Sequence, residues 1–330
     1  MASQQKHLER LIERDGAAGS VVRVSRSLMG TLFEIAAWAS SGREAATEDL
    51  LSEALEAVAE LEKQISSWDP ESETSALNRA AGTAPVAIGG DLRALVDRAV
   101  YWAERTDGAF DVTVAPLREL WNRAGAQGVL PTETEIKSEL KRVGFKKILA
   151  EGQTLFLTQP GMRLGFGAIG KGFAADRAAE RLLAAGVENF IVGAGGDLIV
   201  HGSRGGAPWQ VGVRDPRGMG LLAVSALSNR AVATSGDYEQ FISIGGSRYS
   251  YIFDPRSGKP VSGLTSVTVF STRAADSDAL ATALFVMGSD EGVAFVEGLP
   301  DVEALFVTEE GSTILSSGLR LENETLEILE

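Results

Sequence analysis

Residues 165–172 combine glycine and lysine in a pattern typical of phosphate binding. They read Gly-Phe-Gly-Ala-Ile-Gly-Lys-Gly and precede a helical pattern over residues 173–185. Glycine allows the backbone to approach a ligand closely, and the free N–H groups at the start of a helix favour an anion. Lys171 adds a positive charge at the same place. We therefore expect phosphate chemistry here, with a turn that only packs a helix against a sheet as the alternative.

Two known phosphate-binding motifs fit this stretch only in part. A Walker A loop needs Ser or Thr after its lysine to hold magnesium, and Gly172 stands there instead. A dinucleotide-binding fingerprint needs an acidic residue at the end of the next strand. The next predicted strand, residues 189–192, leads through glycines directly into another strand, residues 197–200. A Rossmann unit is therefore not expected.

The composition excludes several classes of site and partner. The 330 residues are 44% hydrophobic, which is enough to bury a large core, and the net charge of −14 argues against nucleic acid. With no cysteine and two histidines, the chain has no disulfide, thiolate nucleophile or histidine-rich metal cluster. Any bound metal is therefore expected to be magnesium or calcium with oxygen ligands. We expect no membrane-spanning run.

The predicted elements indicate an α+β fold with largely antiparallel sheets and packed helices, because strands in the second half follow one another without a helix between them. Residues 1–18 lack the apolar core of a signal peptide, and residues 1–20 are predicted to be a flexible leader, followed by a single domain over residues 21–330. Helices are predicted over residues 47–65, 92–104, 132–143 (with a Thr132/Glu135 capping box), 173–185 and 276–287, the last ending at Gly288. A strand interrupted at residues 29–31 is predicted over residues 21–38. Hairpins are predicted over residues 147–157 and 304–315. Further strands are predicted over residues 189–192, 197–200, 209–213, 221–227, 231–234, 241–244, 249–253 and 264–271.

Asp278 and Thr282 lie four residues apart, so they share one face of the predicted helix over residues 276–287. A carboxylate and a hydroxyl are oxygen donors that suit magnesium. The alternative is local: an acidic residue in a first turn is favoured by the helix dipole, and threonine can bond to a backbone carbonyl. Asp276, nearby, is predicted to cap the helix.

Two aromatic residues, Trp68 and Phe110, follow helices in polar segments. Such residues suit stacking on a heterocycle, and covering the edge of a core is the alternative. Asp111 follows Phe110 and is placed to bond to the polar edge of a flat ring.

Taken in order, these segments resemble the ApbE family, the FAD:protein FMN transferases. The resemblance is nearly collinear from about Ser27 to Gly288, and it rests on nine segments in the same order. They are Met29-Gly-Thr31, Ser67-Trp-Asp-Pro70, Ser75-Ala-Leu-Asn78, Thr106-Asp-Gly-Ala-Phe-Asp111, Gly167-Ala-Ile-Gly-Lys-Gly172, Ala194-Gly-Gly-Asp197, Thr234-Ser-Gly-Asp-Tyr238, Asp254-Pro-Arg-Ser-Gly258 and Asp278-Ala-Leu-Ala-Thr282.

The resemblance implies an ApbE-like, T-fold-related architecture and a specific reaction. Such enzymes use Mg²⁺ and FAD, and they transfer FMN to a Thr or Ser hydroxyl in the flavinylation motif of an acceptor flavoprotein, releasing AMP. Some members hydrolyse FAD to FMN and AMP. The positions implied to hold FAD are Met29, Trp68, Ala109, Phe110, Asp111, Gly165, Lys171 and Phe253, and those implied to hold the metal are Ala168 through its carbonyl, Asp278 and Thr282.

The chain departs from the family pattern at three positions. Gly165 stands where Asp is common, Gly193 where Asn is frequent, and Tyr251 where His is usual. Histidine is the natural general base for a hydroxyl, whereas tyrosine, with a reference pKa of about 10, is a poor one at neutral pH. The candidates for catalysis are therefore Lys171, Asp278, Asp237 and Tyr251, with Asp254 as another group that would assist deprotonation.

Two other activities stay open: an FAD pyrophosphatase, and an FAD-binding protein without turnover. Family members are often exported, so a periplasmic or other extracytoplasmic location is expected if a leader has been removed, and a cytoplasmic one otherwise.

Overall fold

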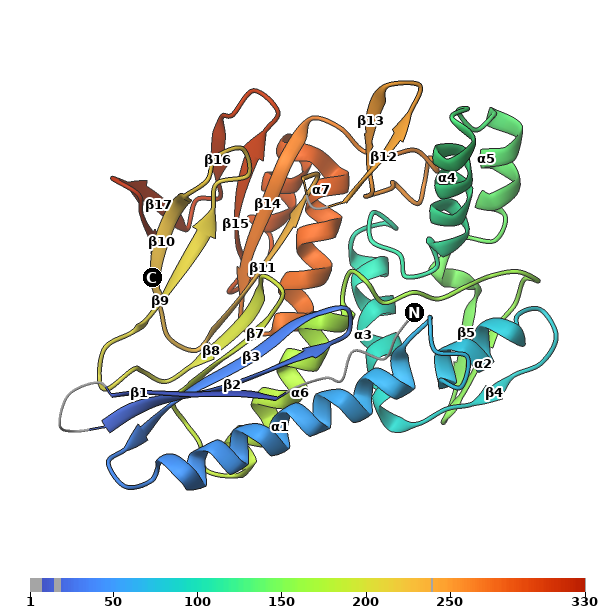
Figure 1. Ribbon diagram of the computed structural model, residues 1–330. Coiled ribbons are helices and arrows are strands. Elements are labelled where there is room, and N and C mark those ends of the chain that lie inside the picture. The colour runs from blue at the N-terminus through green and yellow to red at the C-terminus, as the bar shows by residue number, and fades with distance from the viewer. Residues whose placement is uncertain (1–7, 15–18, 239, 330) are drawn as a thin grey trace.

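The centre of the fold is a nine-stranded sheet (Figure 1). The computed structural model describes residues 8–14, 19–238 and 240–329. All neighbouring strands of this sheet are antiparallel. In spatial order they are β1 (Glu9–Arg14), β2 (Gly19–Leu28), β3 (Thr31–Ser40), β7 (Phe190–Ala194), β8 (Asp197–His201), β11 (Arg230–Gly236), β14 (Leu264–Ser271), β15 (Glu303–Thr308) and β16 (Thr313–Leu315).

Three long helices pack on one face of this sheet: α1 (Glu44–Ile65), α6 (Gly170–Ala184) and α7 (Ala274–Val296) (Figure 1). The predicted apolar stripe of α1 is buried at every expected position, from Leu51 to Ile65. The first two turns of α7 are buried nearly all round, because this helix lies between α6 and strands β11 and β14. The glycine loop and Asp278 thus belong to adjacent helices.

The opposite face of the large sheet carries a smaller sheet, in the order β17 (Leu319–Glu322), β18 (Thr325–Ile328), β10 (Leu221–Leu227) and β9 (Trp209–Arg214). A second apolar cluster joins Val211 and Leu326 of this sheet to Val232 and Phe270 of the large one. The large sheet therefore has a core on each side.

The remaining elements form the region at the right of Figure 1. A third cluster joins Trp121 and Ile136 to Ile242 and Phe253, so two helices and a hairpin pack together there. The elements of this region are α2 (Glu73–Arg79), α3 (Gly90–Arg105), α4 (Ala115–Gln127), α5 (Glu133–Leu140), the 3₁₀ turn η1 (Phe145–Lys147), the sheet of β4 (Val86–Ala87), β6 (Thr154–Leu157) and β5 (Ile148–Glu151), and the hairpin of β12 (Phe241–Ile244) and β13 (Ser247–Ser250).

The architecture confirms the α+β prediction, including the antiparallel pairing of β7 with β8 and the capping box of α5. The expectation of a flexible leader over residues 1–20 was wrong for β1, which pairs along its length with β2. The sequence of β1, Glu-Arg-Leu-Ile-Glu-Arg, has too little apolar alternation to be recognised, because an edge strand tolerates charge. Residues 19 and 20 of that leader belong to β2, and residues 1–7 and 15–18 lie outside the described residues.

Two helices were not predicted. The short helix α2 is capped by Ser72 inside what the sequence suggested was a polar loop, and α4 begins at a proline-containing first turn. The sequence predicted that α7 ends at Gly288. The backbone does leave the helical conformation there, with φ of 80°, but a further helical segment continues to Val296. Among the described residues, α7 is also the one helix long and apolar enough to match a membrane span, and here its residues pack in the core.

Candidate functional site

The glycine loop turns sharply into α6. The N–H groups of Ile169 (3.2 Å) and Gly170 (2.6 Å) both donate to the Phe166 carbonyl, and the helix begins at Gly170. Lys171 therefore stands in the first turn rather than before the helix. This helix has no side-chain cap and no acidic residue in its first turn. The positive end of its dipole and the Lys171 ammonium together suit a negatively charged ligand.

Gly172 is where a Walker A loop would have Ser or Thr, and the packing explains the difference. A Cβ atom at this position would overlap the carbonyl group of Ala274 in α7. The Gly172 N–H also donates to Asp278 Oδ2 at 3.1 Å. Glycine is therefore required for α6 and α7 to approach each other closely, and that approach brings Asp278 to the glycine loop.

Asp278 belongs to a buried group of charges. Lys171 Nζ lies 3.7 Å from Asp278 Oδ1 and also forms an ion pair with Asp197, at the start of β8. Asp278 and Asp197 are 4% and 3% exposed. Burial, together with the nearby charge of Asp197, raises the pKa of Asp278 to about 7 against the attraction of Lys171. Burial likewise raises the pKa of Asp197. No role was predicted for Asp197, which directly follows two glycines.

This charge arrangement fits a cation. Two buried carboxylates beside one ammonium leave negative charge that a divalent ion would compensate. Thr282 lies one turn after Asp278, as predicted, and its Oγ1 is 3.1 Å from Ser235 Oγ in β11. The Ala168 carbonyl belongs to the loop just before α6, and among the described residues no backbone hydrogen bond reaches it.

The part of the chain that the structure describes contains no group of three or more His, Cys, Asp or Glu side chains around one point. A cage built from protein carboxylates is therefore not the arrangement here. The carboxylate of Asp278, the hydroxyl of Thr282 and the carbonyl of Ala168 are oxygen donors that would need further oxygens from phosphate and water, which is how proteins usually hold magnesium.

A cleft of about 380 Å³ is lined in part by Leu164, the residue that precedes the glycine loop. Trp68 stands at its rim with 81% of its surface exposed, and the Arg118 guanidinium lies 5.4 Å from its ring centre. At the other end, the Asn78 side chain bonds to both the carbonyl (3.0 Å) and the N–H (2.7 Å) of Leu164, which directly precedes Gly165. The lining residues are Ser67, Trp68, Asn78, Ala115, Arg118, Glu119, Asn122, Arg123, Arg163 and Leu164.

The segment at residues 109–111 borders the loop through its backbone, since the Val112 carbonyl accepts the Gly165 N–H at 2.9 Å. Its side chains point inward: Ala109 and Phe110 are 1% and 2% exposed. Phe110 therefore covers the core, which was the alternative to stacking on a heterocycle. Asp111 is satisfied internally by the Thr113 N–H (2.8 Å) and the Phe145 N–H (2.7 Å), and burial raises its pKa.

Met29 reaches the start of α6 from the large sheet. It occupies the turn between β2 and β3 with φ of 51°, and its N–H donates to Glu62 at 2.8 Å. Its Cε lies 3.6 Å from where a Cβ of Gly170 would be. The predicted residue Met29 therefore does lie beside the start of α6.

The outer residues of the predicted set lie around α4 and the β12–β13 hairpin. The Tyr251 hydroxyl accepts a hydrogen bond from the Asn122 amide at 2.9 Å, and Asn122 lines the Trp68 cleft. Phe253 is 5% exposed and packs with Trp121, their ring centres 6.2 Å apart. The Asp254 carboxylate accepts the backbone N–H (2.9 Å) and guanidinium (2.9 Å) of Arg256, which is the turn arrangement.

Asp237 directly follows the last residue of β11, two residues after Ser235, and its N–H donates to the Thr265 carbonyl at 3.0 Å. Arg217 holds the Asp237 carboxylate through two contacts of 3.1 Å. Asp237 also lines a second cleft, of about 510 Å³, together with Trp121, Arg248 and Tyr249.

Comparisons with known proteins agree on one family. The model of the ApbE family matches residues 29–306. An FAD:protein FMN transferase from Treponema pallidum (strain Nichols) is 34% identical over 328 residues, covering 92% of this chain and 90% of that protein. One from Klebsiella pneumoniae (strain 342) is 35% identical over 257 residues, covering 76% and 79%.

Solved structures show the same similarity. The flavin transferase ApbE from Vibrio cholerae has a TM-score of 0.79 at 31% identity, covering 91% of this chain and 98% of that one. The apo flavinyl transferase ApbE from Pseudomonas stutzeri has a TM-score of 0.81 at 30% identity, covering 92% and 97%.

Proposed function

The chain belongs to the ApbE family, and on that premise we propose that it transfers the FMN half of FAD to a Thr or Ser hydroxyl of a partner flavoprotein and releases AMP. One observation carries the proposal. The buried group of Asp278, Lys171 and Asp197 stands at the N-terminus of α6, and the Trp68 cleft is lined by Leu164, the residue before the glycine loop. Such an arrangement would suit a planar ring joined to a diphosphate.

FAD is proposed to bind with its diphosphate at the start of α6. The positive end of the α6 dipole and the Lys171 ammonium would neutralise its charge. Trp68 would stack on a ring of the nucleotide, because its face is open to the cleft. The roles of Ala109, Phe110, Asp111, Gly165 and Phe253 in holding FAD stay predictions; the buried side chains among them leave backbone groups as their means of contact.

Magnesium is proposed to bind to Asp278, Thr282 and the Ala168 carbonyl. When bound, it would stabilise negative charge on the diphosphate oxygens. Asp278 supplies the only carboxylate of this set, and Lys171 lies next to it. The protein fixes both groups on packed helices, so they need little reorganisation during the reaction.

The transfer itself needs a proton acceptor near the acceptor hydroxyl. The hydroxyl gives up its proton, its oxygen attacks the FMN-side phosphorus, and the bond from that phosphorus to the bridging oxygen breaks, so that AMP leaves with the bridging oxygen. We assign the role of proton acceptor to Asp237, because Asp237 lies two residues after Ser235, whose hydroxyl contacts Thr282. The 510 Å³ cleft that reaches Asp237 would then admit the acceptor segment.

The test measures AMP from FAD and Mg²⁺ with and without candidate acceptor flavoproteins, and the mass of each acceptor. Acceptor-dependent AMP together with an added FMN mass on a Thr or Ser supports transfer. Release of AMP and FMN in equal amounts without any acceptor would indicate a pyrophosphatase. Tyr251 at the position where the family usually has His is the feature that favours this second activity. Tight FAD binding with no AMP in either case would indicate a binding protein. The Asp237→Asn variant should lower transfer while leaving FAD affinity unchanged.

A further inference from the structure

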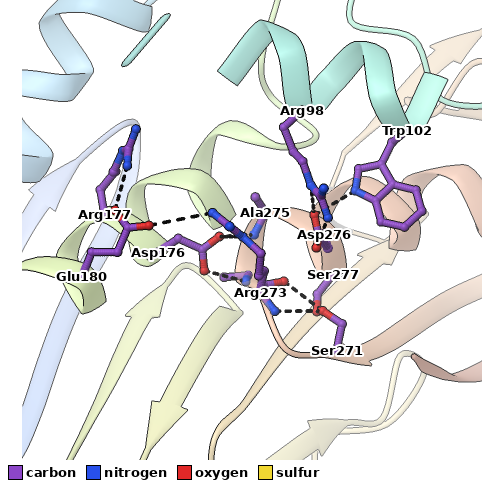
Figure 2. Close-up of polar contacts among 11 residues, drawn as sticks. Arg98, Trp102, Asp176, Arg177, Glu180, Ser271, Arg273, Ala275, Asp276 and Ser277 are labelled. Atoms are coloured by element: carbon purple, nitrogen blue, oxygen red, sulfur yellow. Dashed lines mark hydrogen bonds and ion pairs between the residues drawn. The ribbon is translucent and has the colours of Figure 1, made fainter. Parts of the chain in front are cut away.

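The first turn of α7 takes its cap from a different helix (Figure 2). The residue before the helix, Arg273, makes no capping hydrogen bond with its side chain. Instead, the Asp176 carboxylate of α6 accepts the N–H groups of Ala274 (2.8 Å) and Ala275 (3.1 Å). These groups would otherwise lack partners, since the first N–H groups of a helix have none within it. The start of α7 and its place against α6 are therefore fixed by the same two bonds.

A second carboxylate fixes the same turn from the other side. Asp276 accepts hydrogen bonds from the guanidinium of Arg98 through both of its oxygens and from Trp102 Nε1 at 2.8 Å, both on α3 (Figure 2). The prediction that Asp276 caps the helix was wrong, because it is the third helical residue and its side chain turns to α3. Three helices thus meet at one turn of α7.

The contact between α6 and α7 continues to the candidate site. Gly172 and Asp176 lie four residues apart on one face of α6. On that face, a side chain at position 172 would overlap the Ala274 carbonyl. The Gly172 N–H donates to the Asp278 carboxylate. Asp278 follows Ala274 by four residues, about one turn. A shift of the first turn of α7 would therefore move the Asp278 carboxylate directly.

We propose that Asp176 is a positioning residue: it sets where Asp278 and Thr282 stand relative to Lys171 and the glycine loop. This inference rests on the proposed function, because the positioned groups are those assigned to the diphosphate and the metal. Asp176 itself is 4% exposed, accepts the two backbone N–H groups, lies 3.7 Å from the Arg273 guanidinium and lines neither cleft. Its effect on the reaction must therefore pass through α7.

The experiment compares Asp176→Ala and Asp176→Asn with a control, Ser316→Ala. Ser316 is also buried and accepts a backbone N–H, that of Ala304 at 2.9 Å, but at the β15–β16 end of the sheet. The direct readout is exchange of the Gly172 N–H by nuclear magnetic resonance, because this group reports on Asp278 without FAD or metal. We expect exchange about tenfold faster in Asp176→Ala, as loss of one hydrogen bond of ordinary strength would give, and no change in the control.

Kinetics supply the second readout. We expect Asp176→Ala to lower kcat for AMP release by about 10- to 100-fold with KM for FAD within about threefold, because small misplacements cost rate more than binding. Asp176→Asn keeps one acceptor oxygen and should recover part of that loss, and it serves if the alanine variant does not fold.

Two results separate the possible failures. An Asp176 variant that lowers the melting temperature as Ser316→Ala does, with unchanged Gly172 exchange and kcat, would overturn the positioning role. A wild-type protein that releases no AMP would overturn the proposed function, and Gly172 exchange would still decide whether Asp176 places Asp278.

Discussion

Helices α6 and α7 hold the inner half of the candidate site, whereas loops, the helix α4 and the β12–β13 hairpin hold its outer half. In the inner half, Asp278 and Asp197 are almost fully buried and are fixed by packed helices and a strand. In the outer half, Trp68 is 81% exposed and the Asp237 carboxylate is paired with Arg217 near the surface. The two halves thus differ in solvation as well as in rigidity.

The difference separates two tasks of the proposed reaction. Charge on a diphosphate is stabilised best by groups that are fixed and shielded from water, as in the inner half. Recognition of a flavin ring and of an acceptor protein needs accessible surface, as in the outer half. Tyr251 belongs to the outer half, whereas Lys171, Asp278 and Thr282 belong to the inner half. Substitutions in the two halves should therefore affect different steps of the proposed reaction.

The largest effect should come from the inner half. Asp278→Ala removes the one carboxylate of the proposed metal set, and we expect kcat for AMP release to fall by about 10²–10³, as for loss of a major electrostatic group. The control is Asp290→Ala, an exposed carboxylate in the later segment of the same helix. AMP release by Asp278→Ala at the rate of the control would show that the inner half is not where the charge is stabilised.

The buried acid Asp176 should make stability depend on pH. Burial raises the pKa of Asp176 to about 6 from its ordinary 3.8, despite the N–H groups of Ala275 and Ala274. Between these values the folded protein holds a proton that the unfolded chain has lost, so this group's contribution to stability is full below about pH 4 and is lost as pH rises through 6. The loss corresponds to about 3 kcal/mol in all.

Urea unfolding of the wild type and Asp176→Asn across pH 4 to 7 measures this contribution, because the amide does not titrate. The unfolding free energy of the variant should rise relative to that of the wild type by up to about 3 kcal/mol as the pH increases. Parallel curves for the two proteins would mean that Asp176 is solvated as an ordinary surface acid.

The sequence predicted the parts of the inner half that depend on local spacing. Asp278 and Thr282 share a face because they lie on one helix, and Lys171 could be placed because the glycine loop precedes another. Asp197 and the Asp176 cap could not be found in this way. Each meets its partner across about 26 to 99 residues of chain, and no periodicity encodes such contacts.

The outer half was less predictable for a different reason. Phe110 and Trp68 both follow helices in polar segments, yet one is 2% exposed and the other 81%. Local sequence does not say which of two such rings meets the core. The helix α4 was missed although it buries Leu117, Leu120 and Trp121. The edge strand β1 was missed because its residues are mostly charged.

Replacing Tyr251 in the outer half with histidine should supply a general base. Tyr251→His places an imidazole, with a reference pKa of about 6.5, beside Asn122, and we expect transfer to an acceptor to rise by about 10², the lower end for a general base. The rate should also acquire a rise with pH near that value. Tyr251→Phe keeps the ring without the hydroxyl, and a histidine variant no faster than this control would show that position 251 lies outside proton transfer.

The smallest effect should come from Trp68, at the exposed rim. Its side chain stabilises little of the fold, so Trp68→Ala should leave the melting temperature unchanged. Stacking of an aromatic ring contributes about 0.5–1.5 kcal/mol, so KM for FAD should rise about 2- to 10-fold while kcat stays close to that of the wild type. Trp68→Phe, which keeps an aromatic face, should recover most of the affinity. A fall in kcat with unchanged KM would instead mean that the rim takes part in the chemical step, and the separation of tasks between the two halves would fail.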